Sequence, residues 1–151
     1  MRQGDKREAC HDSFMASLRK ELSLDADRKH VWSALRDFGA VHTRLAPGFV
    51  TGTTMDGETV RVVTFFNGSS ARETLVSCDD ASRRLVYAII GGRATHYSAG
   101  AQVFDDGPGR SHLVWIVDVL PDAIAPYIDD MMRRGVAVMA ATLEQPPTTA
   151  P

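Results

Sequence analysis

Residues 59–92 read TVRVVTFFNGSSARETLVSCDDASRRLVYAIIGG, which is three short β-type runs divided by turn signals. Asn67-Gly68, the polar residues around Asp79-Asp80, and Gly91-Gly92 mark the turns, because glycine, asparagine and aspartate adopt turn conformations at low cost. Two further β-type runs follow and are separated by DDGPG at residues 105–109. Consecutive runs joined by short turns predict an antiparallel meander, and the natural twist of such a sheet curls it and creates a concave face.

C-terminal to the meander, the sequence predicts one long amphipathic helix from Asp122 to about Leu143. Pro126 falls in its first turn, where proline is tolerated. Gly135 falls in its interior, where glycine costs about 1 kcal/mol relative to alanine, so we expect a strand or a ligand to come close there. One helix against a wide, curled sheet leaves a hollow between them, and this hollow is where we expect the function to reside.

N-terminal to the meander, Ser13–Leu24 alternate apolar and polar residues, with Lys20 as the one exception on the apolar side. The helix after it is predicted to begin at an N-cap formed by Asp25. Its apolar positions recur at helical spacing, namely Val31, Trp32, Leu35 and Phe38. The predicted strands are Ser13–Leu24, Phe49–Thr54, Thr59–Phe66, Arg72–Cys78, Arg84–Ile90, Thr95–Phe104 and Ser111–Leu120. The order β-α-β6-α predicts an α+β fold, with a seven-stranded curved antiparallel sheet around a long C-terminal helix.

The length of 151 residues is typical of one domain, which we predict at residues 13–144 with flexible tails at 1–12 and 145–151. A net charge of −2 gives no basic surface of the kind that phosphate backbones require, so no nucleic acid partner is expected. No apolar run of about 18 residues is present, so no membrane span is expected. The first residues are charged and do not form a secretory signal, and Cys10 and Cys78 are expected to be free thiols. Free thiols are typical of a reducing compartment, so a cytoplasmic location is expected. The sequence does not decide between a monomer and a homodimer.

The motifs of common cofactor and metal sites are missing from the sequence. The five histidines are scattered and lack partners at metal-ligand spacing. No Walker loop, no G-x-G-x-x-G opening a helix and no G-x-S-x-G elbow occurs. We therefore predict no metal and no cofactor.

Strand alternation offers a weaker signal, because side chains two residues apart share one face of a strand. On this basis the candidate site side chains are Arg61, Val63 and Phe65, then Glu73, then Tyr87 and Ile89, and finally Tyr97 and Ala99. If they point into the concave face, they form an apolar cavity with a few convergent polar groups, which is how small-molecule sites are built. The alternative is that Arg61 and Glu73 form a salt bridge on the outer face, and alternation alone does not choose between the two.

The order of elements resembles the SRPBCC, or START-like, superfamily with its helix-grip fold, which includes polyketide cyclases and dehydrases, lipid carriers and plant abscisic acid receptors. The resemblance covers about Phe14 to Leu143, and the most specific stretches are Val60–Gly68, Arg72–Leu75 and Leu85–Gly92. It is similar in order and spacing to the polyketide-cyclase-like branch. The loops at 67–71 and 93–95 fall where the receptors have entrance loops but lack the receptors' gate sequences, so a receptor for that hormone is not supported.

The resemblance implies a role for each candidate residue. Arg61 and Phe65 would face the cavity, and Glu73 would be its internal carboxylate. Tyr87, Ile89, Tyr97 and Ala99 would line the walls. Tyr127, Met131 and Gly135 would form the wall on the closing helix, where their spacing of four residues independently places them on one stripe.

These residues leave two functions open. The first is a binding protein for a hydrophobic, oxygen-bearing small molecule. The alternative is a cyclase or dehydratase type of enzyme, in which Glu73 acts as general acid or base and Arg61 or Tyr97 stabilises the developing charge. We expect an adjacent Arg61 to lower the pKa of Glu73 and hold it ionised, which favours the binding protein.

Overall fold

The computed structural model describes residues 15–146. In chain order the elements are β1 (Ala16–Leu24), α2 (Arg28–Arg36), η1 (Val41–Leu45), β2 (Val50–Met55), β3 (Val60–Phe65), β4 (Ser70–Asp79), β5 (Arg84–Ile89), β6 (His96–Asp105), β7 (Ser111–Leu120), η2 (Asp122–Ile124) and α3 (Ala125–Leu143). The predicted order β-α-β6-α and the α+β fold class are confirmed. Ser13, Phe14 and Cys10, the predicted tail at 1–12, and residues 147–151 of the second tail lie outside the described residues.

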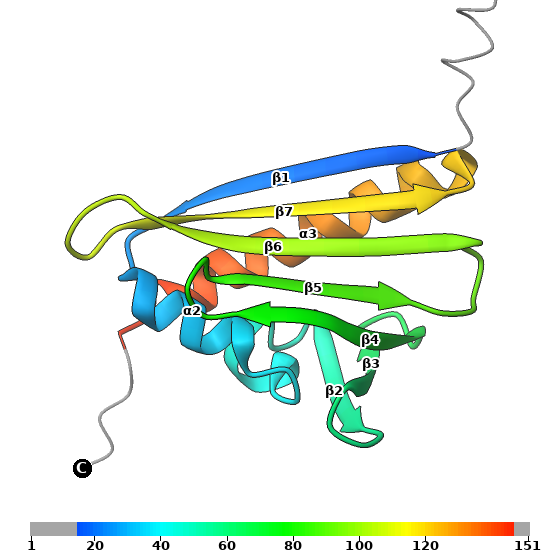
Figure 1. The fold of residues 1–151 in the computed structure, drawn as a ribbon, viewed down its shortest axis with the longest axis horizontal. Coiled ribbons are helices and arrows are strands. Elements are labelled where there is room, and N and C mark those ends of the chain that lie inside the picture. Colours follow the sequence, from blue (N-terminus) through cyan, green and yellow to red (C-terminus); the bar gives the residue numbers. More distant parts are fainter. Residues whose placement is uncertain (1–14, 147–151) are drawn as a thin grey trace, which may run out of the picture.

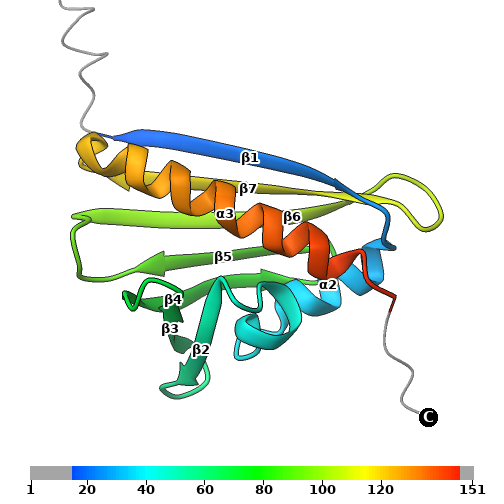
Figure 2. The same cartoon turned by 180° about the vertical axis from the view of Figure 1, so that it is seen from behind.

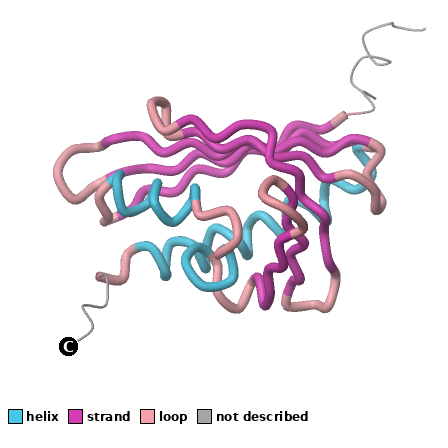
Figure 3. The backbone as a smooth tube through the Cα atoms, turned by 60° about the horizontal axis from the view of Figure 1, so that its bottom comes forward, coloured by secondary structure: helices cyan, strands magenta, loops and turns pink. Residues whose placement is uncertain are grey.

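A single antiparallel sheet holds all seven strands in the order β1-β7-β6-β5-β4-β3-β2 (Figure 1). The strands from β2 to β7 form the predicted meander. The first strand of the chain, β1, pairs with the last one, β7, along its whole length. The sheet curls, and the helices gather on its concave side (Figure 3). Seen from behind, α3 runs across that side along β1 and β7 (Figure 2). The closing helix therefore covers the concave face, as predicted.

Strand alternation separates a buried face from an exposed one. In β7 the buried side chains recur at every second residue, with Leu113, Trp115, Val117 and Val119 turned inward. From α3, the buried side chains Met132, Met139 and Leu143 complete this core. Burial of apolar surface of this kind is the main favourable contribution to folding.

Lys20, the exception on the inner face of β1, has a structural explanation. Its ammonium group donates a hydrogen bond to Asp129 of α3, with 2.6 Å between Nζ and Oδ1. The pair is only partly exposed, so the lysine stem can pack on apolar surface while its charge is matched. The residue that interrupts the sequence pattern thus joins β1 to the closing helix.

The predicted N-cap at Asp25 is wrong. The helix begins at Arg28, and Asp27 occupies the N-cap position without a side-chain cap hydrogen bond. The reason lies in Ala26, which is buried and whose carbonyl accepts a hydrogen bond from Ser111 Oγ at 2.8 Å. Because this carbonyl is engaged with Ser111 and Asp27 has extended backbone angles, the helix begins only after Asp27.

The closing helical segment begins at Asp122, as predicted, but its first turn is not α-helical. Residues Asp122–Ile124 form a short 3₁₀ helix, and the α-helix begins at Ala125 with Pro126 in its first turn. A 3₁₀ turn at a helix N-terminus is common. Among residues 15–146, no helix is long and apolar enough to cross a membrane.

Candidate functional site

A cavity of about 510 Å³ lies between the concave face of the sheet and the helical layer. Its walls come from β2 to β7 and from the helical elements α2, η1, η2 and α3, and most of the lining side chains are apolar. Small-molecule sites typically measure about 300–1,000 Å³ and combine an apolar lining with a few polar groups. The hollow predicted between one helix and a wide sheet is therefore present and has the size of a ligand site.

Arg61 and Glu73 form a buried ion pair within this cavity. The two residues lie directly opposite each other on β3 and β4. Arg61 Nε donates a hydrogen bond to Glu73 Oε1 at 2.7 Å, and the side chains are only 5% and 7% exposed. Strand alternation left open whether this pair faces inward or outward, and the structure turns it inward.

The position of the Arg61 guanidinium is set by more than its carboxylate partner. Its Nη1 donates to the carbonyl oxygen of Phe38 at 3.2 Å. Its central carbon lies 4.0 Å from the centre of the Phe38 ring and 5.0 Å from that of Tyr87. Cation–π contacts of this kind strengthen when desolvated. The cation is therefore held in one place by two rings, a carbonyl and a carboxylate.

Burial dominates the acid–base behaviour of the site. It raises the pKa of Glu73 above its ordinary value, although the charge and the hydrogen bond of Arg61 oppose the rise. The sequence-based expectation of a lowered pKa is therefore wrong in sign, because removing the carboxylate from water outweighs its contact with one cation. Burial likewise raises the pKa of Tyr87 and of Tyr97, so both phenols stay neutral and can donate.

Several polar groups of the cavity have unused hydrogen-bonding capacity. The Tyr97 side chain forms no hydrogen bond within residues 15–146, and Glu73 accepts only the one from Arg61. A guanidinium offers five N–H donors, of which Arg61 uses two. A ligand with oxygen atoms can satisfy these groups.

The mouth of the cavity brings together the two predicted entrance loops and the first turns of α3. Tyr127 is 42% exposed there, and its hydroxyl receives a hydrogen bond from Asn67 Nδ2 at 3.4 Å. The Arg93 guanidinium carbon lies 5.8 Å from the centre of the Tyr127 ring. Tyr127 therefore contacts both loops across the mouth.

Most of the candidate residues line the cavity, namely Arg61, Val63, Phe65, Glu73, Tyr87, Ile89, Tyr97, Tyr127 and Met131. Ala99 and Gly135 do not. Ala99 is buried on the inner face between its strand partners Tyr87 and Val117, and its single methyl group does not reach the open space. Both positions therefore belong to the packed part of the core.

Gly135 lies where α3 packs tightly against two aromatic side chains. A Cβ atom added there would lie 3.2 Å from Phe49 Cε1 and 3.4 Å from Trp115 Cζ3. The glycine therefore permits close packing of the helix on two aromatic rings, so of the two neighbours expected for it, a strand or a ligand, the structure shows the strand.

Sequence reasoning missed several lining residues. Trp115 projects from β7 into the cavity, and the alternation of that strand could have predicted this. The lining side chains Val41 and Leu45 come from η1, a π-helical turn that carries no periodic signal in the sequence. The contact of Arg61 with the Phe38 carbonyl also had no signal, because a backbone group in a loop has no side-chain signature.

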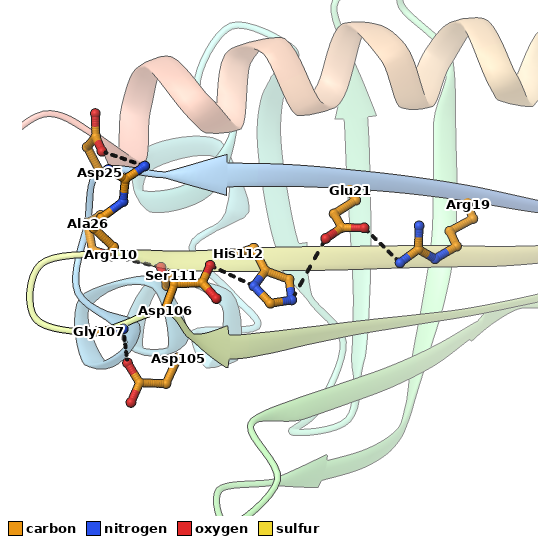
Figure 4. Close-up of polar contacts among 10 residues, drawn as sticks. All are labelled: Arg19, Glu21, Asp25, Ala26, Asp105, Asp106, Gly107, Arg110, Ser111 and His112. Atoms are coloured by element: carbon orange, nitrogen blue, oxygen red, sulfur yellow. Dashed lines mark hydrogen bonds and ion pairs between the residues drawn. The ribbon is translucent and has the colours of Figure 1, made fainter.

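A second polar cluster lies on the outer face of β1 and β7, away from the cavity (Figure 4). His112 Nδ1 lies 2.7 Å from Asp106 Oδ2, and His112 Nε2 lies 3.8 Å from Glu21 Oε1. Asp105 accepts the Gly107 N–H at 3.0 Å, and this backbone hydrogen bond is the main reason that the pKa of Asp105 is lowered. The cluster holds the β6–β7 turn, and the described part of the chain contains no group of three such side chains able to hold a metal ion.

A curled antiparallel sheet that wraps a long C-terminal helix around an internal cavity defines the helix-grip class of domain. Residues 15–144 match the family model described as "Polyketide cyclase / dehydrase and lipid transport", so this chain belongs to that family. The predicted membership of the SRPBCC, or START-like, superfamily is confirmed. No curated protein sequence matches the chain.

Solved structures share the fold at low sequence identity. An uncharacterized protein from Bacillus thuringiensis has a TM-score of 0.77 at 16% identity, over 86% of this chain and 100% of that one. Norcoclaurine synthase from Thalictrum flavum, in complex with dopamine and hydroxybenzaldehyde, has a TM-score of 0.69 at 18% identity, over 95% and 91% of the two chains. The di-domain ARO/CYC BexL from the BE-7585A biosynthetic pathway has a TM-score of 0.74 at 12% identity, over 85% of this chain and 46% of that one. These similarities concern the fold.

Proposed function

We propose that this protein binds a small, largely apolar, oxygen-bearing molecule in the cavity between the sheet and α3. The observation that carries the proposal is the cavity of about 510 Å³ with an apolar lining and the inward-facing Arg61, Glu73 and Tyr97. Apolar walls supply most of the binding free energy, while the polar groups select the orientation. A neighbour of the same fold is solved with dopamine and hydroxybenzaldehyde, which are small aromatic molecules bearing oxygen.

Binding should be visible as stabilisation. A ligand present at about 100 times its dissociation constant stabilises the folded state by roughly 2.7 kcal/mol, because it binds the native state and not the unfolded one. Thermal-shift screening against aromatic polyketides, fatty acids and steroids, together with native mass spectrometry of freshly purified protein, measures this. Trp115→Ala, which removes a wall of the cavity, should reduce the shift. The absence of a shift with every class of compound would contradict the proposal.

An acid–base enzyme is the second candidate, favoured by the raised pKa of Glu73. General acid or base catalysis requires a carboxyl group whose pKa is raised toward neutral pH, and a pocket that excludes water raises it in this way. Here Glu73 would move the proton, and the neutral Tyr97 hydroxyl would donate to the developing oxyanion. Glu73→Gln separates the two candidates. An enzyme loses turnover while the variant still binds ligand, whereas a binding protein shows no turnover before or after the substitution.

A further inference from the structure

The cavity holds one permanent cation in contact with one titratable acid. Arg61 and Glu73 are both buried and are joined by the hydrogen bond of 2.7 Å. A guanidinium is charged at every pH that a folded protein tolerates, whereas a carboxyl group exists in two forms. The net charge of the pair is therefore set by the protonation state of Glu73 alone.

Part of the Arg61 guanidinium is free to meet a ligand. Its Nε and Nη1 donate to Glu73 and to the Phe38 carbonyl, and its remaining N–H groups have no hydrogen-bond partner within residues 15–146. The side chain lines the cavity and is held by the rings of Phe38 and Tyr87. A planar, preorganised guanidinium with a free edge suits a carboxylate, phenolate or sulfonate.

We propose that the cavity binds an organic anion through Arg61 and that Glu73 takes up one proton from solvent for each anion bound. This inference rests on the proposed function, because it names the class of ligand that the same cavity takes. The ionised pair is neutral, so an added anion would leave one uncompensated negative charge in an apolar site, which is costly. A proton on Glu73 restores neutrality and gives the ligand an additional O–H donor.

The other ionisable groups around Glu73 leave it as the acceptor of that proton. Besides Arg61, the ionisable residues that line the cavity are Arg72 of β4, Tyr87 of β5, Arg93 of the β5–β6 turn, Tyr97 of β6 and Tyr127 of α3. Both buried phenols are already protonated, since burial raises their pKa. His42 of η1 does not line the cavity. Arg72 already pairs with Asp56, and both of these side chains are exposed. Burial also raises the pKa of Glu73, which brings its protonation closer to neutral pH.

Two fluorescent probes with the same aromatic skeleton test the inference. Anilinonaphthalene sulfonate carries a sulfonate that stays ionised, and phenylnaphthylamine lacks it, so any pH dependence confined to the first probe comes from the protein. Across about pH 5 to 9, the affinity for the sulfonate probe should fall about tenfold per pH unit above the pKa of Glu73, because one proton is linked to binding. The affinity for the neutral probe should stay constant. Calorimetry in buffers of different ionisation enthalpy should report one proton taken up per sulfonate probe bound.

Three variants test whether Glu73 is the residue that takes up the proton and whether Arg61 is the residue that binds the anion. Glu73→Gln should abolish the pH dependence and keep tight binding of the sulfonate probe at high pH. Arg61→Gln should weaken the sulfonate probe selectively. Arg93→Gln is the matched control, because it removes a cation at the mouth and should leave the pH dependence unchanged.

The outcomes separate this inference from the proposed function. If the neutral probe binds while the sulfonate probe binds without proton uptake, or fails to bind, the inference is overturned and the binding function stands. The inference is also overturned if Arg93→Gln, in place of Arg61→Gln, removes the preference for the anion. If neither probe binds, the proposed function fails as well. If Glu73→Gln fails to fold, the number of protons that the wild-type protein takes up per sulfonate probe, measured by calorimetry, decides whether the inference stands.

Discussion

Glu73→Ala is expected to lower the free energy of unfolding by about 3–5 kcal/mol, because it leaves the Arg61 cation buried without its carboxylate. Arg61 is 4% exposed, so solvent compensates only part of the lost charge contact. The Phe38 carbonyl and the two flanking rings remain, but they carry no full negative charge. Urea denaturation followed by circular dichroism measures the change.

Asp56→Ala is the matched control for this experiment. Asp56 pairs with Arg72, which neighbours Glu73 on β4, but the two side chains are 62% and 51% exposed. An exposed ion pair contributes about 0–1 kcal/mol, so the control should unfold nearly as the wild type does. A loss of less than about 1 kcal/mol for Glu73→Ala would show that the Arg61 charge is not buried, and the described site would be wrong.

Gly135→Leu is expected to destabilise the protein by about 1–3 kcal/mol or more, since it forces additional carbon atoms into a packed contact. A Cβ at this position already lies 3.2 Å from the Phe49 ring, before the rest of a leucine side chain is added. The helix would have to move away from β7, or the rings of Phe49 and Trp115 would have to leave their positions. The midpoint of thermal unfolding measures the effect.

Two controls isolate the cause. Ala137→Leu adds a leucine to the exposed side of the same helix and should be nearly neutral. Gly135→Ala adds only the Cβ, whose crowding opposes a helix-propensity gain of up to about 1 kcal/mol, so we expect little net change. A Gly135→Leu variant that is as stable as the wild type but no longer binds apolar probes would restore the interpretation of Gly135 as ligand space.

The sequence by itself determined the strands, their order and which side chains share one face of each strand. Strand β7 spans Ser111–Leu120, as predicted from its alternation and from the turn before it. The same alternation placed Arg61 and Glu73 on matching faces of neighbouring strands, and the structure pairs them. These features are local: a strand has a side-chain period of two, and a short turn makes consecutive strands pair.

Only the tertiary structure decided the features that depend on how separate elements pack. The alternation could not say whether Arg61 and Glu73 face the cavity, because both faces of a sheet have the same period. It could not place Gly135 against Phe49, since residues distant in the sequence meet there only once α3 lies on the sheet. The sign of the Glu73 pKa shift likewise depends on the depth of burial, which the whole fold sets. Local periodicity tells which side chains share a face of an element. The contacts between residues far apart in the sequence, and the burial of each side chain, follow only from the assembled core.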